Sequence, residues 1–381
     1  MSKLDELIQQ YCPDGVEWKT LGEATIMKRG TSTTKGVMQE GNIPVISGGR
    51  QPAFYCNVSN RTGEVITVAG SGAGAGYVQY WNEPIFVCDA FSIQGNETLK
   101  TKYVYYVLTS IQEKIYSTKK GGGVPHVHIS SVDKFEIPVP PLPVQEEIVR
   151  ILDNFTELQA ELQAELQKRK LQYNYYLDNL LNFNRGGQTE VRWMKMKDIG
   201  KVCMCKRILK SQTSSSGEVP FFKIGTFGGD ADAYISQALF NEYKARYSYP
   251  QKGDILISAA GTIGRTIVFD GTPSYFQDSN IVWLRHDESI VLNSYLRFCY
   301  TLNPWVVSTG GTIARLYNDN ILEATIPVPS LADQQKIVSI LDRFDRITND
   351  LTAGLPAEIE KRRQQYEYYR DKLLSFKRKG A

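Results

Sequence analysis

Two blocks of the sequence occur twice, and this duplication limits the folds open to the chain more than any other feature. Residues 137–155, IPVPPLPVQEEIVRILDNF, return as residues 326–344, IPVPSLADQQKIVSILDRF, with 12 of 19 positions identical. Residues 165–183, ELQKRKLQYNYYLDNLLNF, return as residues 358–376 with 11 of 19 positions identical. The repeat distance of about 190 residues is far longer than a solenoid unit of about 20 to 45 residues. We therefore predict two copies of one domain-sized module in the 381 residues.

Each copy begins with a long stretch of β-prone runs. Runs such as EVITVAG, YVQYW and DILISAA are short and are separated by loops rich in glycine, serine and threonine. Residues 63–78, GEVITVAGSGAGAGYV, parallel residues 253–268, GDILISAAGTIGRTIV. A proline-rich hinge ends each stretch, and because proline cannot propagate a helix that it follows, we expect a helix only after it. The hinges contain Pro138, Pro140, Pro141 and Pro143 in the first copy and Pro327 and Pro329 in the second.

The segments after the hinges carry apolar residues at spacings of three and four, the pattern of an amphipathic helix. The apolar seam contains Leu152, Phe155, Leu158, Leu162, Leu166, Tyr173 and Tyr176 in the first helix and Leu341, Phe344, Leu351, Ile359, Tyr366 and Tyr369 in the second. At 1.5 Å per residue each seam would be about 55 to 60 Å long, more than one domain of this size needs. We expect the two helices to pack on each other in antiparallel fashion. The alternative is that each helix packs on the sheet of its own module.

These features predict an α+β protein with two tandem β-rich α/β domains, separated by two long antiparallel helices in a coiled-coil-like, pseudo-twofold arrangement. The expected domains are residues 1–145 and 184–333, and the expected helices are residues 146–183 and 334–381. A helix restart is expected at Pro356, because proline removes a backbone donor and clashes with the preceding turn.

A four-residue unit is repeated in the first helix, where residues 156–167 read TELQ-AELQ-AELQ. Each unit adds about 6 Å and about 40° beyond one full turn. Inserting or deleting a unit would therefore move and rotate one domain relative to the other without touching either. Alternatively, the stretch is a low-complexity sequence that only favours helix.

Composition excludes several classes of protein. No apolar run approaches the ~18 residues of a membrane span, and no secretory signal is visible, so we expect a cytoplasmic protein without a membrane partner. Six cysteines without a CxxC pair and three histidines do not form a metal or disulfide framework, which favours reduced thiols. The net charge of +3, from 44 basic and 41 acidic residues, does not by itself indicate a nucleic-acid binder.

Known catalytic motifs are matched only in part. Asp14, Glu17 and Lys19 spell part of a PD…ExK nuclease motif, but such a site needs carboxylates from separate strands around Mg²⁺. The glycine-rich residues 70–76 do not fit GxGxxG, and residues 303–305, NPW, lack the second proline of an NPPY-type methyltransferase loop. His126 and His128 would share one face of a strand without a third ligand. We expect no catalytic and no metal-binding residue in this chain.

Loops that combine cations, hydroxyls and glycine recur at matching places in both copies, and this chemistry suits phosphate and base contacts. Each loop alone is more often a solvated surface, but their recurrence favours a shared binding edge. The candidate DNA-binding residues are Lys28, Arg29, Thr31, Arg50, Lys119 and Lys120 in the first copy and Lys206, Arg207, Lys210, Lys223, Thr312 and Arg315 in the second. The helices match closely between copies while the polar loop residues differ, as expected of one framework that reads two different half-sites.

The doubled blocks IPVPP-L-x-x-Q-x-x-IV-x-IL-D-x-F and KRxxQYxYYxDxLLxF, with GTIG at 261–264, resemble the DNA specificity subunit of type I restriction-modification systems. The resemblance covers essentially the whole chain and adds Thr262 and Arg265, in and beside GTIG, to the candidate DNA contacts. The first-copy loop GSGAGAG departs from this motif. The N-terminal residues 3–11 look like a short helix that completes the bundle near the second long helix and gives a circular arrangement.

This resemblance implies a non-catalytic subunit in which each domain reads one half of a bipartite, asymmetric sequence on double-stranded DNA. It also implies partners: two modification subunits that methylate adenine and two ATP-driven restriction subunits. S-adenosylmethionine, ATP and Mg would be bound by those partners and not by this chain. The alternative from a different class is a bivalent protein-binding scaffold with two related modules on a helical rod, and a second rival is an enzyme.

Overall fold

The computed structural model describes residues 2–183, 191–307 and 314–380. The chain forms two compact units: residues 1–164 with 357–381 make unit 1, and residues 165–356 make unit 2. Each unit contains one β-rich module together with parts of both helical segments. No helix in the described ranges is long and apolar enough to cross a membrane.

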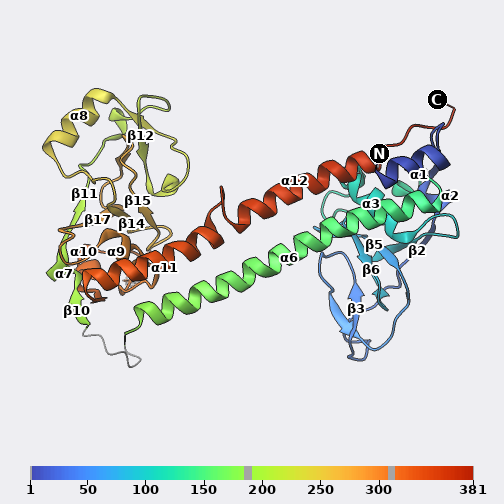
Figure 1. Ribbon diagram of the computed structural model, residues 1–381, viewed down its shortest axis with the longest axis horizontal. Coiled ribbons are helices and arrows are strands. Elements are labelled where there is room, and N and C mark those ends of the chain that lie inside the picture. Colours follow the sequence, from blue (N-terminus) through green and yellow to red (C-terminus); the bar gives the residue numbers. More distant parts are fainter. Residues whose placement is uncertain (1, 184–190, 308–313, 381) are drawn as a thin grey trace. The chain divides into compact units, whose positions relative to one another are not determined.

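Unit 1 builds its module from three small sheets, and Figure 1 draws most of this module in shades of blue and cyan. β2 (Ile26–Arg29), β8 (Ala90–Gln94), β5 (Val65–Ala69) and β6 (Val78–Trp81) form an antiparallel sheet in that order. β3 (Ile43–Ile46) pairs antiparallel with β4 (Phe54–Cys56) and parallel with β7 (Phe86–Val87), and β1 (Glu17–Thr20) pairs with β9 (Glu136–Val139). The helices are α1 (Lys3–Tyr11), α2 (Leu21–Ala24), α3 (Thr101–Ser110), α4 (Gln112–Ser117), α5 (Ile129–Val132), the first part of α6 (Leu142–Leu181) and most of α12 (Leu355–Leu373).

Unit 2 repeats these three sheets. β11 (Gly200–Met204), β17 (Ile281–His286), β14 (Ile255–Ser258) and β15 (Thr266–Val268) form the antiparallel sheet in that order. β12 (Val219–Phe222) pairs antiparallel with β13 (Tyr234–Ile235) and parallel with β16 (Tyr275–Phe276), and β10 (Arg192–Lys195) pairs with β18 (Thr325–Val328). The helices are α7 (Met196–Ile199), α8 (Gln237–Arg246), α9 (Asn293–Thr301), α10 (Asn318–Glu323), α11 (Leu331–Asn349) and the second part of α6, with 3₁₀ turns at Lys210–Gln212 and Ile224–Thr226.

Corresponding strands therefore have the same neighbours in both units, and the duplication of the helix blocks extends through the β-rich stretches. The predicted fold class, two tandem β-rich domains with a long helix between them, is confirmed. Unit 2 adds α8 between β13 and β14, whereas residues 57–64 of unit 1 pass from β4 to β5 without a helix.

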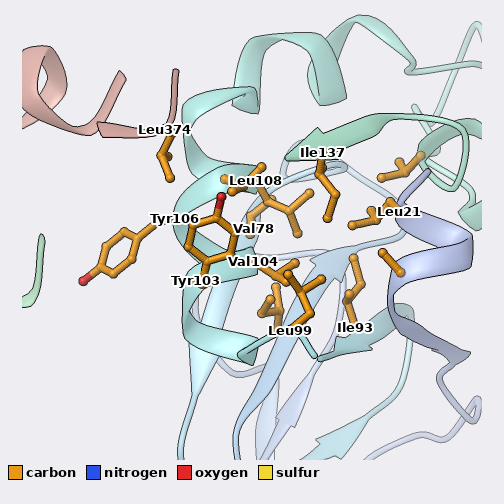
Figure 2. Packing of buried hydrophobic residues seen from close by; sticks show 14 of the residues in the cluster. Leu21, Val78, Ile93, Leu99, Tyr103, Val104, Tyr106, Leu108, Ile137 and Leu374 are labelled. Carbon is orange, nitrogen blue, oxygen red and sulfur yellow. The ribbon is translucent and has the colours of Figure 1, made fainter. Parts of the chain in front are cut away.

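The core of unit 1 lies between the four-stranded sheet and α3. All five residues of β5 are buried: Ile66 and Val68 pack in the cluster that includes α3, whereas Val65 belongs to a second cluster with β3 and β7. Figure 2 shows Tyr103 of α3 within this packing, with Leu374 reaching it from the segment after α12. A strand covered on both faces needs apolar side chains at successive positions, which explains why VITVA shows no alternation.

The glutamine shared by residues 137–155 and 326–344, Gln145 in the first copy and Gln334 in the second, ties a long helix to its own module. Gln145 is fully buried; its Oε1 accepts from the Lys100 amide at 2.9 Å, and its Nε2 donates to the carbonyls of Thr98 at 2.8 Å and Pro140 at 2.7 Å. Gln334 is also fully buried and makes the equivalent three bonds in unit 2, to the Leu292 amide and the carbonyls of Ile290 and Pro329, at 2.9, 2.9 and 3.0 Å. The buried amide thus satisfies backbone groups that would otherwise have no partner at each hinge.

The helix boundaries differ from the expectation that helices start only after the hinge prolines. α6 begins at Leu142, so Pro143 lies within its first turn, and α12 begins at Leu355 with Pro356 in the same position. Proline is accepted in the first turn because its missing amide has no helical partner there. The restart expected at Pro356 is a complete break, since α11 ends at Asn349.

Leu351 is the one predicted seam residue that the structure places outside both helices. It lies in the turn between α11 and α12, where the red helical segment of Figure 1 is interrupted, and its side chain is 80% exposed. The spacing pattern included it because the periodicity continues across the break. The helix break removes Leu351 from the packed seam.

The first helical segment is α6, and the second consists of α11 and α12. The two segments pack on each other through a contact that occurs twice. In unit 1 the ring of Phe155 on α6 stacks on Tyr369 of α12, with centroids 5.6 Å apart, and in unit 2 Tyr176 of α6 stacks on Phe344 of α11 at 5.1 Å. In the repeat, Phe155 corresponds to Phe344 and Tyr176 corresponds to Tyr369. The same pair therefore forms with its roles exchanged, as expected of antiparallel, pseudo-symmetric helices.

The alternative packing, in which each helix covers its own module, also occurs. Leu152 of α6 is fully buried in the core of unit 1, and Leu341 of α11 is fully buried in the core of unit 2. Farther along, Leu181 of α6 is buried in the core of unit 2, and Leu374 after α12 in that of unit 1. Of the other seam residues, Leu166 is buried, Leu158, Leu162, Tyr173, Ile359 and Tyr366 are half-buried, and Tyr369 is 37% exposed.

The two ends of the described chain meet in unit 1. α1 has the predicted bounds, and Leu4 is buried in the same cluster as Leu374. The Val16 amide donates to the Lys377 carbonyl at 2.9 Å, and the Lys379 amide donates to the Val16 carbonyl at 3.0 Å. The N-terminal helix therefore lies with the end of the second helical segment, which agrees with a circular arrangement.

Glu147 on α6 holds α1 in place, and this contact should depend on pH. Its side chain is 3% exposed, and its carboxylate accepts from Arg150 at 2.6 Å and from Nζ of Lys3 at 2.9 Å, which lowers its pKa from 4.5 to about 2. A carboxylate with a lowered pKa stabilises the fold above its ordinary pKa, and this stabilisation disappears as the pH falls from 4.5 through 2.

We expect Glu147→Gln to lower the free energy of unfolding at pH 7 by about 1 to 2 kcal/mol, a modest value because Lys3 and Arg150 are themselves exposed. The difference from the wild type should vanish near pH 2. Urea unfolding at pH 7, 4 and 2 measures this, with the exposed Glu146→Gln as the control. An equal loss of stability in both variants would show that Glu147 has no special role.

Candidate nucleic-acid interface

Three loop segments of unit 2 lie at one edge of its four-stranded sheet. β11 ends at Met204 opposite Val282, and β14 ends at Ser258 opposite Ile281, the first residue of β17. Because neighbouring strands are antiparallel, residues 205–213, 259–265 and 277–280 all leave the sheet at this edge, which we call the unit 2 loop edge. Sequence-distant polar residues are thereby brought together.

Four predicted DNA-binding cations line one pocket of about 510 Å³ at the unit 2 loop edge: Arg207, Lys210, Lys223 and Arg315. They come from separate segments, after β11, after β12 and before α10. The stretch 277–280, Gln-Asp-Ser-Asn, lines the same pocket with acceptors and donors. A concave surface with four cations and one lining carboxylate attracts an anionic ligand.

Hydrogen bonds and ion pairs hold three of these four cations in place. Nε of Arg207 donates to Oδ2 of Asp278 at 2.9 Å, and Nζ of Lys223 lies 2.8 Å from Oδ1 of Asp232. Nη2 of Arg315 donates to the Ser279 carbonyl at 2.9 Å and to Oδ1 of Asn280 at 3.2 Å. Such bonds reduce the side-chain freedom that each cation would lose on binding.

The remaining unit 2 candidates surround this pocket. Nζ of Lys206 lies 5.2 Å from the centre of the Tyr247 ring, and its amide donates to the hydroxyl of Tyr275, whose pKa burial raises above its ordinary value. Thr262 and Arg265 lie in the β14–β15 loop on the same edge, outside the pocket lining, and Arg265 donates to the Gly228 carbonyl at 3.1 Å. Thr312 lies outside the described residues.

The GTIG turn in this loop depends on its second glycine. Gly264 has a φ of +80°, and a side chain there would lie 2.6 Å from Oδ1 of Asn303. Both the left-handed conformation and the close approach favour glycine. The turn thus keeps Thr262 and Arg265 at the loop edge.

Unit 1 presents an equivalent loop edge. β2 ends at Arg29, the β5–β6 loop covers residues 70–77, and residues 88–89 precede β8. Lys28, Arg29 and Thr31 are exposed on β2 and just beyond it, and the Thr31 amide donates to the Val87 carbonyl at 2.9 Å. Three of the predicted residues therefore lie on or beside this edge.

The other unit 1 candidates approach the same glycine-rich loop. The Arg50 guanidinium lies 4.9 Å from the centre of the Tyr77 ring, and Nζ of Lys119 lies 4.3 Å from that of Tyr116. A side chain at Gly48 would lie 2.2 Å from the Ser71 carbonyl, so these two loops are packed backbone to backbone. Lys120 pairs through its backbone with His126, which also bridges to Ser71.

Sequence reasoning missed the polar residues beside the cations. Asp278 in unit 2 and Asp89 in unit 1 each come two residues after the short strand that pairs parallel with the middle strand of the three-stranded sheet. The sequence prediction selected basic and hydroxyl residues and left these acids out. Because the two acids occupy equivalent positions in the two copies, a comparison of the copies could have identified them.

His126 and His128, predicted to share a face, have stacked rings with centroids 6.0 Å apart. Within the described residues no group of three histidines, cysteines or acids could hold a metal ion. All six cysteines are free thiols, and five of them are buried.

Solved structures define the class of this fold. The crystal structure of the S subunit of a type I restriction-modification system from M. genitalium aligns with a TM-score of 0.64 and 17% identity over 94% of this chain and 96% of that one. A chain from a study of complex assembly and conformational transition of the type I restriction-modification system aligns with a TM-score of 0.60 and 18% identity, over 95% and 98%. At these identities the likeness concerns the fold.

The family is shown by sequence. The family model described as the type I restriction modification DNA specificity domain matches residues 13–169 and again residues 189–361, once in each copy. The chain belongs to this family of DNA specificity subunits, and it is a non-catalytic DNA-recognition subunit with two target-recognition domains.

Two relatives match nearly the full length. A Haemophilus influenzae protein named as a type I restriction enzyme specificity subunit is 44% identical over 383 residues, which cover 95% of this chain and 96% of the relative. A type I restriction enzyme specificity subunit of Escherichia coli is 31% identical over 426 residues, 99% of this chain and 97% of the relative.

Proposed function

We propose that the chain reads a bipartite, asymmetric DNA target, with the unit 1 loop edge on one half-site and the unit 2 loop edge on the other. The observation that carries this proposal is the equivalent position of cation-bearing loops at the same sheet edge of two modules with one topology. Their side chains differ, so the two half-sites should differ too. The loop cations would neutralise phosphates, and a few side chains in each unit would contact base edges.

The paired helices would set the distance between the half-sites. Neither unit alone should bind tightly, because one half-site offers few contacts. The covalent connection through α6 makes binding of the second half-site effectively intramolecular, so affinity should depend on the spacer as well as on sequence.

For the assembly, we propose two modification subunits that dock on the helices and two restriction subunits that join them, in the cytoplasm. S-adenosylmethionine would be bound by the modification subunits, and ATP and Mg by the restriction subunits. Membership in the family supports partners of this kind.

The salt dependence of DNA binding separates this function from that of a protein-binding scaffold. We expect the complex with a modification subunit to retain duplex DNA, with log K falling about 0.9 per neutralised phosphate for each unit of log salt. About six phosphate contacts would reduce affinity by on the order of 10³-fold between 50 and 200 mM salt. Fluorescence anisotropy of a labelled duplex measures the affinity at each salt concentration. If an intact complex bound no DNA at 50 mM salt, the protein-binding scaffold would be favoured.

A further inference from the structure

The Arg207–Asp278 pair combines a fork of donors with a carboxylate acceptor at the unit 2 pocket. Nε of Arg207 donates a hydrogen bond to Oδ2 of Asp278 at 2.9 Å, which fixes the orientation of the guanidinium. The Arg207 side chain is 68% exposed and the Asp278 side chain is 16% exposed. Within the described residues neither terminal amino group of Arg207 donates to a protein acceptor. The pair therefore offers two oriented donors beside one acceptor oxygen.

The backbone around Asp278 is held in an unfavourable conformation. Ser279 has a φ of +60°, a left-handed value that few non-glycine residues adopt. The Asn280 amide donates to the Asp278 carbonyl at 2.7 Å, and Arg315 binds the Ser279 carbonyl. Strain of this kind persists where the surroundings fix the position of a functional side chain.

The equivalent acid in unit 1 has a different partner. Asp89 accepts a hydrogen bond from the hydroxyl of Ser71, whereas Arg29, the last residue of β2 at this edge, forms no ion pair with it in the described part of the chain. Both copies thus keep an acid at the loop edge but pair it with different donors. Two modules that read different half-sites need such a difference.

We propose that Arg207 and Asp278 together read one G·C base pair in the major groove of the second half-site, an inference that rests on the proposed function. Guanine offers the acceptors N7 and O6, which suit the terminal amino groups of Arg207, and cytosine offers the N4 amino donor, which suits the Asp278 carboxylate. Adenine would place its N6 amino donor against the Arg207 donors. A phosphate is less suited to this pair, because Asp278 would repel it.

Selection of bound sequences from a randomised duplex pool tests this assignment, with the chain in complex with a modification subunit. The wild type should enrich G·C at one position of the second half-site. Arg207→Ala and Asp278→Ala should each weaken that preference by about 10- to 100-fold and leave the first half-site unchanged. Asp278→Asn, which keeps the size of the side chain, should do the same if Asp278→Ala disturbs unit 2.

Arg29→Ala is the control, since it alters the arginine at the end of β2 on the unit 1 loop edge and should leave the second half-site as in the wild type. Enrichment of the first half-site by each unit 2 variant shows that the complex is intact. Uniformly weaker binding by Arg207→Ala, with no position relaxed, would identify a phosphate contact and overturn the proposal. A wild-type complex that enriches no sequence would instead contradict the proposed function itself.

Discussion

Deleting Ala160–Gln163, one four-residue unit of α6, should change the spacer of the DNA target while both half-site sequences stay the same. α6 is one continuous helix of 40 residues, and the chain passes from unit 1 to unit 2 between Ala164 and Glu165, directly after this segment. The deletion shortens α6 by about 6 Å and rotates the remainder of the helix by about 40° beyond a full turn.

The deleted length corresponds to about two base pairs of rise, and the rotation corresponds to about one base pair of twist. We therefore expect a preferred spacer shorter by about one to two base pairs. Affinity for the original target should fall by about 10²- to 10⁴-fold, the gain that bivalent binding can provide. The break between α11 and α12 gives the second helical segment a place to adapt.

Selection from random duplexes measures the spacer directly, and competition binding on the original target measures the affinity. Gln163→Glu, a change of the same segment at constant length, should leave both unaltered. Altered half-sites with the original spacer would show that α6 does not set the distance.

Replacing Gln334 by Leu should strongly destabilise unit 2. The change keeps the volume of the side chain but removes three hydrogen bonds of a fully buried amide, and it leaves the Leu292 amide and the carbonyls of Ile290 and Pro329 without their partner. Each unsatisfied buried group costs about 1 to 3 kcal/mol, and because two of the three bonds are only partly buried we expect a combined loss of about 3 to 5 kcal/mol.

Scanning calorimetry of the chain measures this effect, with the exposed neighbour Gln335→Leu as the control. The transition of unit 1 should stay in place, because the equivalent Gln145 is unchanged. The stabilising role of Gln334 would be disproved by a variant that unfolds within about 1 kcal/mol of the wild type.

The repeated blocks made the helical part of the fold predictable. Phe155, Phe344, Tyr176 and Tyr369 were assigned to a seam from spacing alone, and their stacking in two equivalent pairs follows from the duplication. Local pattern does not show where a helix breaks, because apolar spacing continues through a turn. Leu351 was therefore assigned to the seam, although the chain leaves the helix before it.

The candidate site was predictable as a set of cations but not as a geometry. Lys223 reaches the pocket because β12 pairs in parallel with β16, which brings the residues after the two strands together. Arg315 reaches it through hydrogen bonds to Ser279 and Asn280, which follow β16. No spacing rule in the loops shows that pairing. The partner acid Asp278 was missed for the same reason, since its role depends on Arg207, which is 71 residues away.

We propose above all that one chain reads two different DNA half-sites at a fixed distance. The most direct test is selection of bound sequences from a randomised duplex pool by the wild-type chain in complex with a modification subunit. We expect two unlike short blocks separated by an unread gap of constant length. A single enriched block, two blocks at variable distance, or no enriched sequence from an intact complex would contradict it.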